Sequence, residues 1–458
     1  MSTGMHSQPR EETTVLTKSK FKPSVQKRML VAVGAAMATS LVLSGCGAGS
    51  RTAANTATKV ACDFAKPANP VTINVLAYNS SAVDPYTNTM VASCSKDGVT
   101  VKHDPIDFAG QVQKTQATLG SDKGSYDILE TYSFVVPTFG SQDKLEPLDD
   151  YFNKYKDKYG LGEISPEMIE SVTYDGKMYN LPMQAQVHVM AYRKDILDKY
   201  GIQPPKTMEE LRAAAQKIQA GGEIRYPVAL PWLASSDIAT WYANTMLAQN
   251  KPFVDPQSKK PNFDSPEARK ALEEMKSLLP YMDPQVTTFD QPKVQQQMYN
   301  GSAAISVMFS GRMNDLVQQK NSQYFDKIGF AAPPAVTSGG KTIASLSVDG
   351  WSIPKNASAD KDLLFQIAAS SVSEEASKAS VPAAFPARKG MATEQNSPYA
   401  KAANESMGNV PAPQPYPYIP AVTSAITPIV AKAVGGQLSV DEAVQQMQTE
   451  AEAAVAKS

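Results

Sequence analysis

Histidine and cysteine are scarce in this sequence of 458 residues, which contains three of each. Three cysteines are too few for a fold held together by disulfides, and three histidines leave little material for a metal site. Neither sign of charge is in excess, with 44 Lys+Arg and 45 Asp+Glu, whereas a nucleic-acid binder would carry a basic excess or stripe. Hydrophobic residues make up 42% of the chain, so the composition predicts a globular protein with a large core.

Motifs of several enzyme classes are also missing. The sequence contains no Gly-x-Ser-x-Gly elbow, no His-Glu-x-x-His zinc motif and no phosphate-binding P-loop. A Ser-His-Asp triad would have to use His103 or His188. We therefore expect a protein that is not an enzyme and that binds no cofactor and no metal.

Residues 1–45 are typical of an export signal. Five basic residues lie between positions 18 and 28, and residues 29–43 carry no charge. This apolar run is shorter than the ~20 residues that a membrane-spanning helix needs, although an uncleaved anchor remains the alternative. Leu43-Ser44-Gly45-Cys46 resembles a bacterial lipobox. That resemblance implies cleavage before Cys46, a lipid on its sulfur and attachment to the extracytoplasmic face of the cell membrane.

The segment after this motif is rich in Gly, Ala, Thr and Asn, which predicts a flexible tether over residues 46–69. With Cys46 lipidated, Cys62 and Cys94 remain as an even pair in an oxidising compartment. We expect them to form a disulfide that closes a loop of about thirty residues. Two buried free thiols are the alternative.

The first third of the body alternates strands and helices. Apolar residues alternate over 71–77 and again at 99–101, and 126–130 has the composition of a strand. Phe108, Val112, Thr115 and Leu119 fall on one helical stripe that stops at Gly120. This β-α-β-α-β order predicts an α/β fold with a largely parallel sheet, in which ligands bind at the carboxyl ends of strands. Thr207, Ser265 and Ser439 are predicted N-caps of later helices.

Seven stretches between residues 127 and 388 resemble, in order and spacing, the extracellular solute-binding proteins of ABC importers, in the large family that binds sugars and related solutes. The most recognisable is Tyr-Asp-Gly-Lys-Met-Tyr-Asn-Leu-Pro at 174–182; the others lie at 127–129, 140–150, 192–195, 204–207, 299–305 and 385–388. Arg193 departs from the asparagine usual in the family. The resemblance covers nearly all of residues 70–458.

The resemblance implies an α/β, two-lobed periplasmic-binding-protein fold with crossover hinges and a ligand cleft between the lobes. It places the N-terminal lobe at 70–182 plus 346–400 and the C-terminal lobe at 183–345 plus 401–458. It further implies a monomer that closes on a sugar or polyol and delivers it to the ABC permease subunits in the membrane.

Sugars and polyols expose hydroxyls and apolar C–H faces, so their sites combine aromatic rings with planar polar side chains. Gln184, Gln186 and His188 share one face of an extended segment, although His188 fits a buried structural histidine better. The candidate ligand-binding residues, at positions where the family carries its site, are Tyr78, Asn79, Ser80, Tyr132, Gln184, Gln186, Trp232, Trp241, Phe309, Arg312, Asp349, Trp351, Arg388, Tyr416 and Tyr418.

Each of these candidates has a structural alternative. Trp232, Trp241 and Trp351 fit a core as well as a site, and Arg312 fits a surface ion pair. An exported carbohydrate-active enzyme is the main rival function, because the paired carboxylates of a glycosidase have no fixed spacing in a sequence. A binder of a non-sugar solute such as a glycerol phosphate is a further alternative, but only Arg312 and Arg388 suggest the handling of an anion.

Overall fold

The computed structural model describes residues 57–457. Its strands are β1 (Val71–Leu76), β2 (Val99–His103), β3 (Ile128–Tyr132), β4 (Thr173–Tyr174), β5 (Lys177–Met178), β6 (Leu181–Arg193), β7 (Val228–Ala229), β8 (Ile305–Phe309), β9 (Ile328–Ala331) and β10 (Leu346–Ser352). Its longer helices are α1 (Asp84–Cys94), α2 (Phe108–Gly120), α7 (Met208–Ala220), α8 (Asp237–Leu247), α9 (Pro266–Leu278), α10 (Gln291–Tyr299), α12 (Lys361–Ser371), α14 (Ala400–Met407), α15 (Ile419–Val434) and α16 (Val440–Ala456).

Shorter helices complete the described chain. They are α3 (Val136–Ser141), α4 (Asp149–Tyr155), α5 (Pro166–Ser171), α6 (Lys194–Lys199), α11 (Met313–Leu316) and α13 (Glu374–Ser380), with the 3-10 turns η1 (Leu161–Glu163), η2 (Leu279–Tyr281), η3 (Val286–Thr288) and η4 (Ser310–Arg312).

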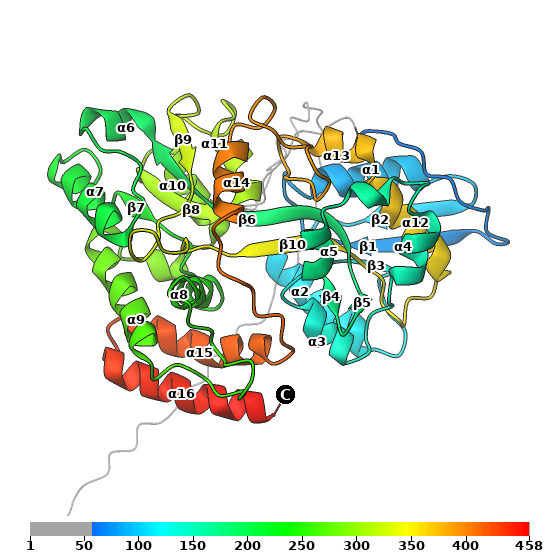
Figure 1. Cartoon of the computed structure of the whole chain (residues 1–458). Helices are drawn as coiled ribbons and strands as arrows, with labels where there is room; N and C mark the ends of the chain where they lie inside the picture. Colours follow the sequence, from blue (N-terminus) through cyan, green and yellow to red (C-terminus); the bar gives the residue numbers. More distant parts are fainter. Residues whose placement is uncertain (1–56, 458) are drawn as a thin grey trace, which may run out of the picture. The chain divides into compact units, whose positions relative to one another are not determined.

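The long strand β6 and its partner β10 are the centre of the main sheet, whose strand order is β2-β1-β3-β10-β6-β8-β7, with β9 also paired to β6. Figure 1 shows β6 and β10 side by side. β1 pairs parallel to both β2 and β3, as the alternation of strands and helices predicted. β10 is antiparallel to β3 and to β6, so these two central strands link one half of the sheet to the other.

Local sequence signals explain where several elements begin. The predicted N-cap Ser439 forms both bonds of a capping box with Glu442. At the predicted N-cap Thr207 only one of the two bonds forms, because the Glu210 carboxylate accepts from the Lys206 amide instead. The third strand was predicted at 126–130 but spans Ile128–Tyr132. Asp127 bonds Asn74 twice: its main-chain amide donates to the Asn74 carbonyl oxygen at 2.8 Å, and its carboxylate accepts the Asn74 amide hydrogen at 2.9 Å. The paired strand begins at the next residue.

Two large hydrophobic cores lie at opposite ends of this strand order. One is built from β1, β3, β10, α1 and α12 and includes Trp351 and Phe365; we call the part around it the N-terminal lobe. The other is built from α7, α8, α9, α15 and α16, and a neighbouring cluster packs on β6, β8 and α14; we call the part around these two clusters the C-terminal lobe. This mixed α/β architecture is the two-lobed fold predicted above.

The disulfide expected between Cys62 and Cys94 is present, with the two Cα atoms 5.5 Å apart. Cys94 is the last residue of α1, and both cysteines are fully buried in the N-terminal core. The bridge therefore ties the segment before β1 to the end of α1. The predicted signal and Cys46, the predicted lipidation site, lie outside the described residues. Within residues 57–457, no helix is both long enough and apolar enough to span a bilayer.

Candidate functional site

Tyr78 and Tyr132 come together with Asp349 because of the sheet topology. Tyr78 follows the carboxyl end of β1, and Tyr132 is the last residue of β3, the parallel neighbour of β1. Asp349 of the antiparallel strand β10 lies directly opposite Tyr132. Three predicted residues thus meet at one edge of the N-terminal half of the sheet, where parallel strands present their carboxyl ends.

Asp349 is held by side chains from its own strand and from β6. Gln184 donates from Nε2 to Asp349 Oδ2 at 3.3 Å, and Ser347 donates to Oδ1 at 3.3 Å. A β-bulge falls between Asp349 and Gly350 in the pairing with β6, a device that re-aims a side chain. Burial raises the pKa of Asp349 to about 7, and hydrogen bonds from Gln186, Ser347 and Gln184 oppose that rise.

Gln186 connects this region to the C-terminal lobe. Its Oε1 accepts the backbone amide hydrogen of Gly311 at 3.0 Å, while its side chain also bonds Asp349. Gly311 belongs to η4, which follows β8 directly and also carries Arg312. The prediction that Gln184 and Gln186 share a face of one strand therefore places both glutamines beside Asp349.

Glu130, which the sequence analysis did not select, lies beside these residues in β3. It is completely buried, and its Oε2 accepts the Tyr78 amide hydrogen at 2.9 Å. Burial, and next the charge of Asp349, raise the pKa of Glu130 well above its usual range. The signal for this residue was a carboxylate that directly follows the apolar pair Ile128 and Leu129 in a predicted strand.

Four aromatic rings form a continuous row on the N-terminal lobe. The ring centroids are 5.8 Å apart for Tyr78 and Phe108, 5.5 Å for Phe108 and Tyr132, and 5.4 Å for Tyr132 and Phe134, which are stacked at 6°. Phe108 is 45% exposed and Phe134 52% exposed. Phe108 opens the predicted helical stripe as the first residue of α2, and its ring contacts the two tyrosines.

Arg312 of η4 and Phe309, the last residue of β8, lie in the C-terminal lobe. The positive charge of Arg312 acts on Tyr78, whose pKa is nevertheless raised by burial. Gln295 fixes the turn by donating to the Arg312 carbonyl oxygen at 3.0 Å. Phe309 packs on His188, with ring centroids 4.1 Å apart. The two residues are directly opposite each other where β6 pairs with β8.

Asn79 and Ser80 hold the start of α1. The Asn79 amide donates to both carboxylate oxygens of Asp84 at 2.8 Å, and the Ser80 amide donates to Oδ1 at 3.1 Å. The Asn79 side chain is therefore engaged with Asp84, and the Ser80 hydroxyl oxygen accepts the Val83 amide hydrogen at 3.2 Å. This network fixes the direction in which the chain leaves β1.

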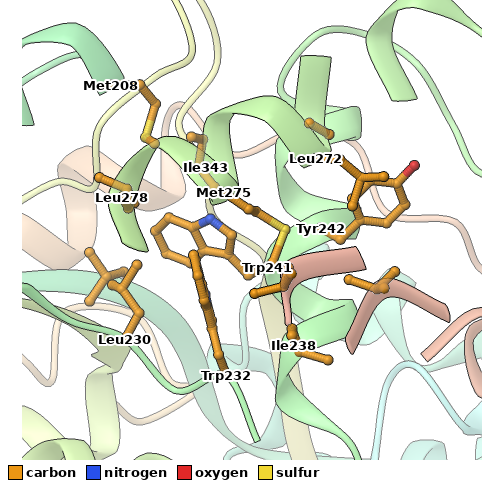
Figure 2. Close-up of a cluster of buried hydrophobic side chains, with 14 of the residues drawn as sticks. Met208, Leu230, Trp232, Ile238, Trp241, Tyr242, Leu272, Met275, Leu278 and Ile343 are labelled. Atoms are coloured by element: carbon orange, nitrogen blue, oxygen red, sulfur yellow. The ribbon is translucent and has the colours of Figure 1, made fainter. Parts of the chain in front are cut away.

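The three tryptophans lie in hydrophobic cores. Trp232 and Trp241 pack together in the C-terminal core, with ring centroids 6.3 Å apart (Figure 2). Trp351 is fully buried in the N-terminal core and donates from Nε1 to Ser371 at 2.9 Å. Their rings contact side chains of those cores. The three tryptophans therefore fit the structural alternative, a position in the core, and we leave them out of the candidate site.

Arg388 and the two late tyrosines also have structural partners. Arg388 donates to the carbonyl oxygens of Val372 at 2.8 Å and Gly160 at 2.7 Å within the N-terminal lobe. Tyr416 and Tyr418 stack at 5.5 Å and pack against the C-terminal core. Arg388 is thus occupied by main-chain acceptors. Among residues 57–457, no three His, Cys, Asp or Glu side chains gather closely enough to hold a metal ion.

Two lobes joined by paired central strands, with polar and aromatic side chains at the meeting of β1, β3, β6 and β10, define a periplasmic-binding-protein architecture. Residues 94–378, more than half of the chain, match the family model described as bacterial extracellular solute-binding protein. The chain therefore belongs to that family of binding proteins, in line with the expectation that it is not an enzyme.

Individual relatives are more distant. A probable ABC transporter-binding protein of Deinococcus radiodurans is 31% identical over 202 residues, which cover 42% of this chain and 46% of that protein. The chain thus spans about half the length of this curated relative. A solute-binding protein of Agrobacterium radiobacter K84 in complex with ribitol superposes with a TM-score of 0.75 at 20% identity, covering 85% of this chain and 100% of the other.

The maltose-bound MalE3 of T. maritima superposes with a TM-score of 0.72 at 21% identity, covering 83% of this chain and 99% of the other. At such identities, these two structures show that the fold is shared.

Proposed function

We propose that this protein captures a neutral sugar or polyol outside the membrane and delivers it, without changing it chemically, to the permease of an ABC transporter. The observation that carries the proposal is the aromatic row of Tyr78, Phe108, Tyr132 and Phe134 beside buried hydrogen-bonding groups. Exposed rings are suited to the apolar C–H faces of a sugar, and neighbouring polar groups to its hydroxyls.

Residues of both lobes take part in the proposed site. The N-terminal lobe side contributes Tyr78, Tyr132, Gln184 and Asp349. The C-terminal lobe side contributes Arg312 of η4, and Gln186 bonds the Gly311 amide of the same turn. A ligand that contacts both lobes stabilises their closed arrangement, because its contacts differ between the open and the closed form. We keep the lobe boundaries near residues 182, 346 and 400 as part of this proposal.

Two ligand-bound structures with the same fold support this ligand class, since one contains ribitol and the other maltose. A glycerol phosphate is disfavoured, because Arg388 is bonded to main-chain carbonyls and the charge of Arg312 already acts on the Asp315 carboxylate. A glycosidase needs two carboxylates that reach a scissile bond. The match to a family of solute-binding proteins favours binding over hydrolysis.

A thermal-shift screen of the protein from residue 47 onward against ribitol, D-mannitol, maltose and other neutral sugars is the first experiment. Calorimetry with the best ligand then compares the wild type with Phe108→Ala and Phe134→Ala, each expected to lower affinity about tenfold through loss of a stacking ring. Tyr126→Ala is the matched control, because that tyrosine contacts Lys114 outside the row. Unchanged affinity in both phenylalanine variants would place the site elsewhere.

The same titrations test the enzyme alternative. Product analysis after incubation with maltose would reveal glucose if the protein were a glycosidase, and we expect none. The lipid anchor is a separate part of the proposal. Cys46→Ala should move the protein from the membrane fraction to the soluble fraction, and an unchanged distribution would contradict lipidation of Cys46.

A further inference from the structure

Two buried oxygen atoms beside Asp349 have no hydrogen-bond partner among the described residues. One is Oε1 of Glu130 and the other is Oε1 of Gln184. Both side chains are completely buried, and in both the other terminal atom is bonded: Glu130 Oε2 to the Tyr78 amide and Gln184 Nε2 to Asp349. Each side chain is therefore fixed at one end and unpaired at the other.

The strand pairing brings these atoms to the same place. Asp349 of β10 lies opposite Tyr132 of β3 on one side and opposite Gln184 of β6 on the other. Glu130 lies two residues before Tyr132, so it is the diagonal neighbour of Asp349, and the charge of Asp349 acts on it. The two unpaired oxygens thus belong to β3 and β6, the two strands that flank Asp349 of β10.

The other acidic groups nearby already have donors. Asp84 accepts from Asn79 and Ser80, and Asp349 accepts from Ser347 and Gln184. Glu130 differs from these carboxylates because only one of its two oxygens is bonded. A buried acceptor without a donor destabilises the protein, and a ligand that supplies the donor removes that cost.

We propose that Glu130 and Gln184 determine ligand specificity by requiring two hydrogen-bond donors from the ligand, which selects neighbouring hydroxyl groups and rejects sugar acids and sugar phosphates. The inference rests on the proposed function, because it concerns the same site. A hydroxyl can donate to either oxygen, whereas a carboxylate or a phosphate dianion offers only acceptors and adds negative charge. A site built to pair with a ligand's donors strongly rejects an analogue that lacks them.

Ligand binding is expected to release a proton from the site. The titratable and charged groups that act around Glu130 are Asp349 of β10, Tyr78 after β1, Asp84 of α1, Tyr132 of β3 and, through Tyr78, Arg312 of η4. Burial, followed by the charge of Asp349, raises the pKa of Glu130 and so favours its protonated form. A hydroxyl that donates to Oε1 favours the ionised form instead, so binding should release a proton and tighten as pH rises.

Matched pairs of probes test the specificity. Calorimetry on the wild type compares ribitol with D-ribonate, and maltose with maltobionate, since each acid differs from its partner mainly in a terminal carboxylate. We expect the neutral member to bind at least tenfold more tightly. Glu130→Gln replaces the unpaired acceptor by a donor, so it should weaken the neutral ligand at least tenfold and shrink the ratio between neutral and acidic ligands. Glu170→Gln, on the exposed surface of the same lobe, should change neither.

The outcomes separate this inference from the proposed function. If the wild type binds no neutral sugar or polyol, both are overturned. If it binds them but binds the acids equally well, or if folded Glu130→Gln keeps both affinities, only the specificity assignment is overturned. Should Glu130→Gln fail to fold, wild-type titrations at pH 6 and 8, in two buffers of different ionisation enthalpy, decide the matter: proton release supports the assignment, and heats independent of the buffer contradict it.

Discussion

Ser81 of the N-terminal lobe donates its hydroxyl hydrogen to Oδ2 of Asp315 in the C-terminal lobe, at 2.9 Å. A second bond between the lobes runs from the Thr138 hydroxyl to the carbonyl oxygen of Pro417, also at 2.9 Å. The lobes are therefore joined by direct hydrogen bonds. These contacts add to ligand affinity only if they form together with ligand binding.

The first prediction follows from that bond. Ser81→Ala removes the donor, and a single hydrogen bond contributes roughly 1 kcal/mol, so affinity for the best ligand of the screen should fall about fivefold. Ser236→Ala is the control, because Ser236 makes an equivalent bond to Asp237 within one lobe. Calorimetry gives the affinities, and small-angle scattering gives the radius of the unliganded form. Equal affinity in the two variants would mean that the Ser81 bond is not coupled to binding.

The second prediction concerns the close approach of the lobes at Gly311. A Cβ atom there would lie 2.8 Å from Gln186 Nε2 and 3.0 Å from the Cβ of Ala82, which belongs to the other lobe. Gly311→Ala should therefore hinder closure and displace Gln186, lowering ligand affinity by more than tenfold while the melting temperature stays within a few degrees.

Gly120→Ala provides the comparison for this variant, since a Cβ at Gly120 meets no atom within 4 Å. Its affinity and melting temperature should both match the wild type. A Gly311→Ala protein that binds as tightly as the wild type would show that the closed contact at this glycine is dispensable.

Much of the fold was predictable because its signals are local. Alternation over residues 71–77 and the capping box at Ser439 depend on neighbouring residues, and β1 and α16 form where these patterns lie. The meeting of Tyr78, Tyr132 and Asp349 required the family resemblance, because it depends on pairing between strands far apart in the sequence.

The parts that sequence reasoning missed depend on orientation. Phe108 is the first residue of its helix, and the direction of a side chain at that position does not follow from the apolar stripe of the later turns. Trp232 has the size and apolarity suited either to a core or to a sugar-binding surface, and only the three-dimensional structure places it in the core. Glu130 could be recognised as unusual within a strand, but its unpaired oxygen appears only once Tyr78 and Asp349 are in place.

The third prediction concerns the disulfide. Cys62 and Cys94 are separated by 32 positions, and closing a loop of that length stabilises the fold by roughly 3–4 kcal/mol in the chain-entropy model. The double variant Cys62→Ser/Cys94→Ser should lower the free energy of unfolding by at least that amount, since it also buries two hydroxyls. Ligand affinity should be unchanged, because the bridge lies at the far end of α1 from Asp84.

Denaturation of the wild type with and without a reductant is the companion measurement. Reduction should reproduce most of the loss, and peptide mapping without reduction should recover Cys62 and Cys94 in one cross-linked peptide. If both cysteines react freely with an alkylating agent in the folded protein, the bridge is absent.

The fourth prediction is a dependence of stability on pH through His188. This side chain is 3% exposed, packs on Phe309 and bonds Ser345 through Nδ1. Burial lowers its pKa from 6.5 to about 4, against a smaller opposing effect of the Ser345 hydrogen bond. Between these two values the unfolded chain binds a proton that the folded protein does not, so stability is lost as pH falls from 6.5 toward 4, by up to about 3 kcal/mol.

His188→Gln tests this assignment, because glutamine keeps polar atoms near Ser345 but does not titrate in this range. Carboxylates also titrate below pH 6, so the informative quantity is the difference between the two proteins in the free energy of unfolding at each pH. We expect wild type and variant to converge, or to exchange order, between pH 7.5 and pH 4, since only the wild type must keep a buried imidazole neutral. A difference that stays constant over this range would show that protonation of His188 does not limit stability.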